Sequence, residues 1–137
     1  SGTNQTMRDH LKGIADDAMA MVEKIEARVL DIGCNDGTLL NNYPEGYIKF
    51  GVDPSDVAQE VNGEITVVQD IFPSAELNSI LGDEKLDIIT SIAMFYDLED
   101  PSAFVKNIKN ALNEEGIWIF EMSMTSFSPI PRKKRII

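Results

Sequence analysis

The sequence predicts an α/β fold in which helices cover both faces of a mainly parallel sheet of about five strands. Short runs of apolar, β-branched residues alternate along the chain with segments of helical periodicity, which is typical of strand–helix–strand units. The runs are nearly continuous in apolarity, as expected of strands that are buried on both faces. With 137 residues, of which 43% are hydrophobic, the chain is sized for one domain with its own core.

The strands are expected at five runs, residues 27–32, 48–52, 65–68, 86–92 and 117–121. Their enrichment in valine and isoleucine favours strands over helices. No run approaches the roughly 20 apolar residues that a membrane-spanning helix needs. After the fifth run, Pro129 and Pro131 argue against further strands in residues 123–137.

The first helix is expected over residues 6–27, because apolar side chains recur there at steps of three and four residues. They form one stripe: Leu11, Ile14, Ala18, Met21 and Ile25. Four connectors are also expected as helices, at residues 37–42, 55–61, 74–81 and from 100 to just before 116. Ser74 can cap the third of these, and Asp100 can cap the fourth with Pro101 at its first position.

The net charge of the chain limits the classes of partner that it is expected to bind. Net charge is −11, and an acidic surface repels the phosphates of nucleic acids and anionic lipids. Neither nucleic acid nor membrane is therefore an expected partner. The basic run at residues 132–135 is typical of a solvated tail more often than of a nucleic-acid patch. We expect one domain at residues 1–122, followed by a basic tail at residues 123–137.

Cysteine and histidine usage points to a reducing, cytoplasmic setting. One cysteine, Cys34, and one histidine, His10, allow neither an internal disulfide nor a structural zinc site. The N-terminus lacks the charged-then-apolar pattern of a signal peptide. His10 is expected to be an ordinary polar position of the first helix, and Cys34 a small packing residue rather than a nucleophile.

The strongest motif is the loop after the first strand. Asp31 ends the strand, and Gly33 and Gly37 permit a tight bend and a close backbone approach to a ligand. A dinucleotide-binding loop would need glycine at the positions of Asn35 and Thr38, and a phosphate-binding loop would need a lysine that is absent. An acid before the loop repels pyrophosphate and suits a ligand that bears an ammonium or sulfonium group.

Two further acids end the next strands. Asp53 lies 22 residues after Asp31, a spacing at which acids accept hydrogen bonds from ribose hydroxyls; a plain helix cap is the alternative. Asp70 ends the third strand, and a turn aspartate is the alternative to a ligand contact there. The fourth strand leads into residues 93–101, beside the point where ligands of open α/β sheets bind.

Residues 31–37 resemble motif I of class I S-adenosylmethionine-dependent methyltransferases, which have a Rossmann-like three-layer fold. The resemblance covers residues 26–122 and implies S-adenosyl-L-methionine as cofactor. The common form has glycine at position 35, and asparagine is among the few residues that tolerate the left-handed conformation. The cofactor-binding residues that the resemblance implies are Asp31, Gly33, Cys34, Asn35 and Gly37 for the methionine part, Asp53 and Pro54 for the ribose, Asp70 with Ile71 or Phe72 for the adenine, and Ala93, Met94 and Phe95 along its border.

Tyr96 is the one weak catalytic candidate; it could face a methyl acceptor or merely close the core. Residues 1–11, 34–40, 51–55 and 94–101 also resemble the central domain of C-methyltransferases of nucleotide-linked deoxysugars. That likeness implies a small-molecule acceptor, a nucleotide sugar methylated at a ring carbon beside a keto group. The chain departs from that family because it has no cysteine cluster, no sequence for the C-terminal antiparallel strand pair and no counterparts of the catalytic histidine and glutamate.

Two hypotheses therefore stay open. The chain is either the core of an active methyltransferase or a non-catalytic cofactor-binding module that needs missing segments or a partner. A nucleotide- or nicotinamide-binding domain is less favoured because two of its glycine positions fail. An incomplete sheet would leave an open edge, which invites a homodimer.

Overall fold

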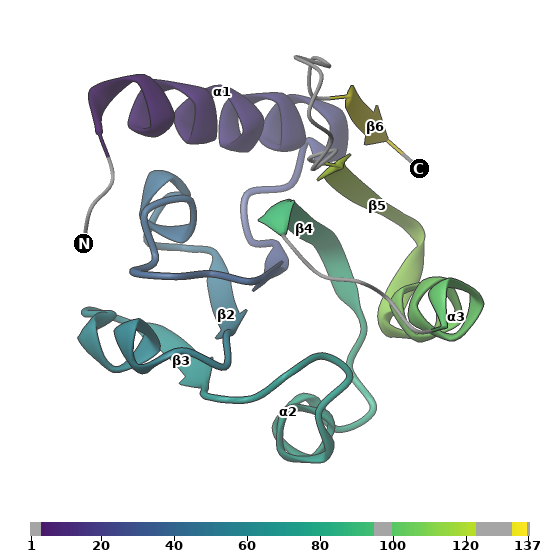
Figure 1. Cartoon of the computed structure of the whole chain (residues 1–137). Helices are drawn as coiled ribbons and strands as arrows, with labels where there is room; N and C mark the ends of the chain where they lie inside the picture. Colours follow the sequence, from purple (N-terminus) through teal and green to yellow (C-terminus); the bar gives the residue numbers. More distant parts are fainter. Residues whose placement is uncertain (1–3, 95–99, 123–132, 137) are drawn as a thin grey trace.

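The computed structural model describes residues 4–94, 100–122 and 133–136. Six strands form one sheet in the order β3-β2-β1-β4-β5-β6 (Figure 1). The first five are mutually parallel, and β6 runs antiparallel to β5. The strands are β1 (Arg28–Ile32), β2 (Ile48–Val52), β3 (Ile65–Val68), β4 (Leu86–Met94), β5 (Leu112–Met122) and β6 (Lys133–Ile136). The predicted α/β fold with five parallel strands is confirmed.

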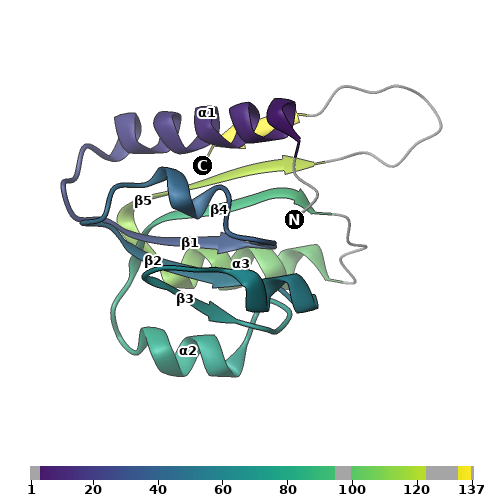
Figure 2. The ribbon, with the colours of Figure 1, turned by 90° about the vertical axis from the view of Figure 1, so that its left-hand side faces the viewer.

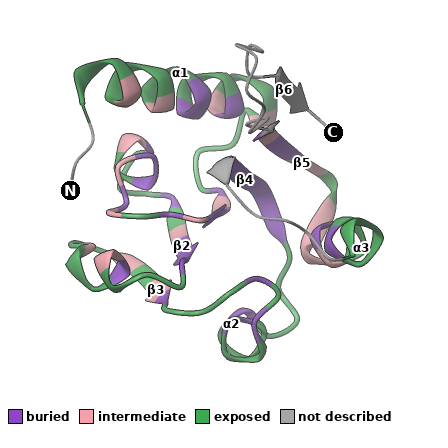
Figure 3. Ribbon diagram, viewed as in Figure 1, coloured by how far each residue is buried: buried purple, intermediate pink, exposed green. Residues whose placement is uncertain are grey.

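Helices cover both faces of this sheet, and each face has its own apolar core. On one face lie α1 (Gln5–Val22) and the 3₁₀ turn η1 (Leu40–Asn42). On the other face lie α2 (Ala75–Leu81) and α3 (Pro101–Ala111). A second 3₁₀ turn, η2 (Asp56–Glu60), precedes β3. Buried residues concentrate on the strands and on the sides of the helices that face them (Figure 3).

The first helix ends earlier than its apolar stripe predicts. Asn4 caps its start, with Oδ1 accepting from the Met7 amide at 2.8 Å. Glu23 then takes a left-handed φ of 54°, and its amide donates to the Met19 carbonyl, which closes the helix at Val22. Ile25, expected on the buried stripe, is 90% exposed. The prediction of a helix to residue 27 is therefore wrong, because a left-handed cap turns the chain toward β1.

Two of the four predicted connecting helices are only 3₁₀ turns. Residues 37–42 give η1, and residues 55–61 give η2. In the first case Gly37, at φ 83°, belongs to the bend itself, and the 3₁₀ turn takes only the last three residues of the predicted helix. The other two helices begin as predicted. The Ser74 hydroxyl accepts from the Leu77 amide at 3.1 Å, and the Asp100 carboxylate accepts from the Ala103 amide at 3.1 Å.

The C-terminal part of the chain holds a strand that the sequence analysis did not expect. Residues 133–136, assigned to a solvated basic tail, form β6 and pair with residues 119–122 of β5. An edge strand can be rich in charged residues. Residues 133–136 therefore lack the apolar pattern from which the other strands were predicted. The expectation of no further strand in residues 123–137 is wrong at residues 133–136. β3 and β6 form the two edges of the described sheet.

The geometry that matters for a ligand is the shared direction of the strands. The carboxyl ends of β1, β4 and β5 point to one side, and the N-terminal half of α1 lies above them (Figure 2). Alternate residues of a strand face the same side of a sheet, so the α1 face receives Asp31 from β1, Ile92 from β4 and Glu121 from β5. A concave site is therefore built between α1 and these strand ends.

Candidate cofactor-binding site

The loop after β1 has three residues in the left-handed backbone conformation, and it is hydrogen-bonded to the end of β2. Gly33, Asn35 and Gly37 have φ values of 77°, 53° and 83°. The Gly33 amide donates to the Val52 carbonyl at 2.8 Å, and the Gly37 amide donates to the Cys34 carbonyl at 2.9 Å. Asn35, which stands where glycine is common, adopts the conformation that asparagine tolerates. The bend thus keeps its shape without the missing glycine.

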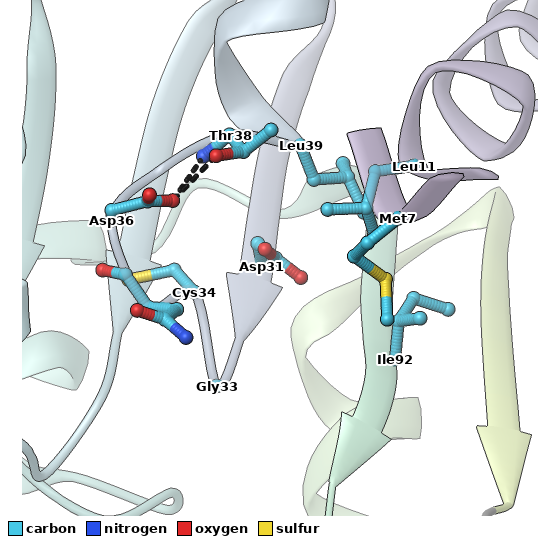
Figure 4. Close-up of a pocket in the computed structure, with 10 residues that line it drawn as sticks. Met7, Leu11, Asp31, Gly33, Cys34, Asp36, Thr38, Leu39 and Ile92 are labelled. Atoms are coloured by element: carbon cyan, nitrogen blue, oxygen red, sulfur yellow. Dashed lines mark hydrogen bonds between the residues drawn. The ribbon is translucent and has the colours of Figure 1, made fainter. Parts of the chain in front are cut away.

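A cavity of about 130 Å³ opens between this loop and α1 (Figure 4). Met7 and Leu11 of α1 and Ile92 of β4 give it an apolar side, and Asp31 gives it an acidic one. The volume is below the ~300 Å³ of a typical small-molecule pocket. An amino-acid-sized group fits the cavity, and the remainder of a larger ligand would lie along the strand ends. The other lining residues are Gly33, Cys34, Asn35, Asp36, Thr38 and Leu39.

Asp31 is a buried carboxyl group of the site. Its side chain is 4% exposed, and Oδ1 accepts from the Thr90 hydroxyl at 2.7 Å. Burial raises the pKa of Asp31 to about 7; the Thr90 hydrogen bond opposes this shift, and the charge of Asp53 adds to it. A buried carboxyl group of this kind is stabilised in its charged form by a cation. The chemistry of the cavity therefore fits a ligand that carries positive charge.

Asp53, the predicted ribose ligand, already accepts three hydrogen bonds within the protein. Oδ2 accepts from the Asn35 amide at 2.9 Å, and Oδ1 accepts from the amide and the hydroxyl of Ser55 at 2.8 and 2.7 Å. The carboxylate thus joins the β1 loop to the end of β2. Since a carboxylate offers about four acceptor positions, roughly one remains for a ligand hydroxyl. Pro54, next in the chain, is exposed.

At the end of β3, Asp70 and Ile71 are both exposed, and Ile71 is 62% accessible. The Asp70 carboxylate accepts from the Ile71 amide at 2.8 Å. Phe72 is only 6% exposed and packs edge-on against Phe104, with ring centroids 5.5 Å apart. Of the two side chains considered for packing on a purine, only Ile71 is available, because Phe72 belongs to the core beneath α3.

Cys34 is held by packing. It is 3% exposed, and Gly51 of β2 approaches it so closely that a Cβ at that glycine would lie 2.7 Å from Sγ. Burial, together with the charges of Asp31 and Asp53, raises the pKa of the Cys34 thiol. A thiol that stays protonated is a poor nucleophile. The position therefore lines the cavity without offering covalent chemistry.

The remaining predicted residues lie at the end of β4 and directly after it. Ala93 and Met94 are its last residues, while Phe95 and Tyr96 lie outside the described residues. Sequence reasoning did not assign several contributors to the site. They are Met7 and Leu11 on α1, Asp36, Thr38 and Leu39 after β1, and Thr90 and Ile92 on β4. Met7 and Leu11 are four residues apart, which places them on one face of a helix, but only the tertiary structure shows what that face covers. His10, between them, pairs with Glu121 of β5.

A family model described as "Methyltransferase domain" matches residues 7–135, nearly the whole chain. The chain belongs to this methyltransferase family. The match includes most of α1, the β1 loop and every strand up to the first part of β6. Among curated proteins, none matches the chain significantly.

Solved structures share the fold of this methyltransferase domain. The complex of the Haloferax volcanii Trm112 methyltransferase activator with a methyltransferase matches at a TM-score of 0.65 and 22% identity, covering 85% of this chain and 54% of that one. The plantazolicin methyltransferase BpumL, in complex with a substrate analogue and S-adenosylhomocysteine (SAH), matches at 0.67 and 18%, covering 86% and 48%. An S-adenosylmethionine-dependent methyltransferase from Clostridium acetobutylicum matches at 0.65 and 18%, covering 84% and 50%. The chain spans about half the length of these proteins. In the part of the chain that the structure describes, no helix is long and apolar enough to cross a membrane.

Proposed function

We propose that this methyltransferase domain binds S-adenosylmethionine across the carboxyl ends of β1 to β4 and donates its methyl group to a small acceptor. The observation that carries the proposal is Asp31, a buried carboxyl group on the wall of the cavity with a pKa raised to about 7. When bound, the cofactor supplies a methyl group on a positively charged sulfur. Asp31 would hold an ammonium or sulfonium group of the bound cofactor, because a cation stabilises the charged form of a buried carboxyl group.

Different parts of the cofactor would contact different residues along the carboxyl edge of the sheet. Gly33, Cys34, Asn35 and Gly37 would hold the methionine part beside Asp31. The ribose would meet Asp53 and Pro54, and the adenine would meet Asp70 and the exposed Ile71. Ala93, Met94 and Phe95 would border the cofactor from the end of β4. The order of the three acids on β1, β2 and β3 supports this division, because these strands are neighbours in the sheet.

The acceptor that we propose is a nucleotide-linked keto-deoxysugar, methylated at the carbon beside the keto group. The support is the likeness of residues 1–11, 34–40, 51–55 and 94–101 to methyltransferases of that class. Such a carbon becomes a nucleophile only after a base removes its proton. A small-molecule acceptor of this kind is in keeping with a cytoplasmic enzyme, which the single cysteine favours.

Calorimetric titration tests the cofactor assignment. We expect saturation by S-adenosylmethionine and by SAH, and none by NAD. Asp31→Asn should weaken S-adenosylmethionine binding about 10- to 100-fold, since a hydrogen bond to a charged group contributes roughly 1.5–3 kcal/mol. Asp83→Asn, at an exposed acid just after α2, is the matched control and should leave affinity unchanged. Saturation by NAD alone would overturn the assignment.

Deuterium exchange tests the acceptor class. In D₂O, with SAH in the cofactor site, the proton beside the keto group of a nucleotide-linked keto-deoxysugar should exchange faster than without protein, as seen by proton NMR. With S-adenosylmethionine, mass spectrometry should find the methylated sugar. Cofactor binding without exchange or product would instead favour the alternative, a cofactor-binding module that depends on further segments or a partner.

A further inference from the structure

An ion pair joins α1 to the end of β5. His10 Nε2 lies 2.6 Å from Glu121 Oε2, and the side chains are 40% and 4% exposed. Glu121 is thus a buried carboxylate, and a buried carboxylate is stable only with a partner that offsets its lost hydration. Lys134 of β6 lies opposite Glu121 in the strand register. His10 is the only histidine of the chain, and it faces this carboxylate from above the sheet.

The pair lies beside the cofactor cavity. Met7 and Leu11 line that cavity, and His10 is three residues after one and directly before the other. Below the helix, Ser91 pairs with Phe120 and Met94 with Met122, so Glu121 runs alongside the end of β4, where Ile92 lines the cavity. The pair does not itself line the cavity, but it lies next to Met7, Leu11 and Ile92, which do, on the side toward β5.

This is also the side that the proposed cofactor leaves free. The three acids that would hold its parts end β1, β2 and β3, on the other half of the sheet. A methyl acceptor must approach the transferred carbon from the side opposite the sulfur, which leaves the end of β5, next to β4, for it. The His10–Glu121 pair is a histidine–carboxylate pair at this position.

We propose that His10, oriented by Glu121, accepts the proton of the methyl acceptor. The inference rests on the function proposed above. Because Nε2 contacts the carboxylate, the neutral imidazole carries its proton on Nε2 and its lone pair on Nδ1. Nδ1 has no hydrogen-bond partner among the side chains that the structure describes. A base whose other nitrogen is fixed by a carboxylate is the arrangement by which histidine activates nucleophiles.

The step balances in atoms and charge. The proton leaves the C–H, N–H or O–H bond of the acceptor for Nδ1, which turns the imidazole into an imidazolium ion beside the Glu121 carboxylate. The electron pair left on the acceptor forms the bond to the methyl carbon. The electrons of the broken carbon–sulfur bond stay on sulfur, which becomes a neutral thioether. Glu121 stabilises the positive charge that His10 gains.

A purely structural tether is the competing explanation, and the packing of α1 argues against it. Ile14, Ala15 and Ala18 already anchor the helix at exposures of 1%, 0% and 0%. Replacing a buried ion pair with apolar residues is often neutral or stabilising, so anchoring alone does not explain a buried charge at this position. Lys12 and Asp16, an exposed pair on the same helix at 2.8 Å, provide a matched control.

NMR of the single imidazole tests where His10 points. The ring C–H signals are recorded in complexes with SAH and with sinefungin, an analogue that carries an amine near the position of the transferred methyl group. We expect these signals to differ between the two complexes, while the ring signals of Tyr47, at the opposite end of the strands, stay unchanged. If both ligands bind and the His10 signals are identical, the inference is wrong. If neither binds, the proposed function itself fails.

Variants of His10 and Glu121 distinguish a general base from a residue that only anchors α1. We expect His10→Gln to keep SAH affinity within about threefold, to retain the melting temperature of the Lys12→Gln control, and to lose about 10²- to 10⁴-fold in the rate of deuterium exchange, the usual contribution of a general base. Glu121→Gln should lose less, because the imidazole remains. A His10→Gln variant that exchanges at the wild-type rate, or that loses SAH binding together with thermal stability, would overturn the assignment.

Discussion

The electrostatics of Asp31 make the stability of the domain depend on pH in a direction opposite to that of ordinary carboxylates. Burial raises the pKa of Asp31 from 3.8 to about 7 in the folded protein. The folded state therefore binds this proton more tightly than the unfolded state. Its contribution to stability is fully present below pH 3.8 and is lost as the pH rises toward 7. Asn at this position removes the titration and still offers an oxygen to Thr90.

The magnitude follows from the two pKa values. A shift from 3.8 to about 7 is 3.2 units, and at about 1.36 kcal/mol per unit the penalty above pH 8 approaches roughly 4 kcal/mol. By the same linkage the penalty at pH 5 is roughly 2 kcal/mol. The difference in unfolding free energy between Asp31→Asn and wild type should therefore shrink by about 2 to 3 kcal/mol from pH 8 to pH 5.

Urea unfolding followed by circular dichroism at both pH values measures this difference. Asp83→Asn, which removes an exposed charge, should show no comparable change. The comparison with wild type cancels the other carboxylates, which titrate in both proteins. A stability difference that stays constant with pH, or that grows on acidification, would refute the view that Asp31 is held mainly neutral by burial.

Three further predictions rest on other parts of the site. S-adenosylmethionine should bind about tenfold more tightly at pH 8 than at pH 6 by calorimetry, because Asp31 is ionised only at the higher pH; equal affinity would contradict a contact between Asp31 and the cation. Gly51→Ala should cost about 1–3 kcal/mol of unfolding free energy, since its Cβ would lie 2.7 Å from Cys34 Sγ, and Cys34→Ala in the same chain should recover part of that loss. Through the open edge at β3, the domain should dimerise at high concentration, and a monomeric sedimentation profile throughout would count against this.

The strands were predictable because the burial of both sheet faces leaves a direct trace in the sequence. Each of β1 to β3 begins within one residue of the predicted position, since continuous apolar runs have few alternative placements. Helix ends were less predictable. Glu23 closes α1 through a left-handed backbone that no apolar pattern encodes, and β6 is a charged edge strand whose pairing depends on β5.

In the site, too, features set by adjacent residues could be predicted, whereas contacts between residues far apart in the chain could not. The bend around Gly33 and Gly37 could be predicted because its residues are adjacent and the conformations they need are rare. The contacts that give the site its chemistry join residues far apart in the chain. Thr90 reaches Asp31 across 59 positions, and Asp53 reaches the Asn35 amide across 18. The partner of His10, Glu121, could not be predicted without the register of the sheet.

The distribution of hydrogen bonds explains why only one of the three acids at the strand ends is poised for a cation. Among the residues whose side chains are described, none of Asp31, Asp53 and Asp70 forms an ion pair. Asp53 is satisfied by two amides and a hydroxyl, and Asp70 is exposed to water. Among the described residues, Asp31 accepts a side-chain hydrogen bond from the Thr90 hydroxyl alone, and it is nearly inaccessible. A phosphate at this edge would meet further negative charge, whereas a sulfonium or ammonium group would compensate the one of these three carboxyl groups that has the fewest described partners.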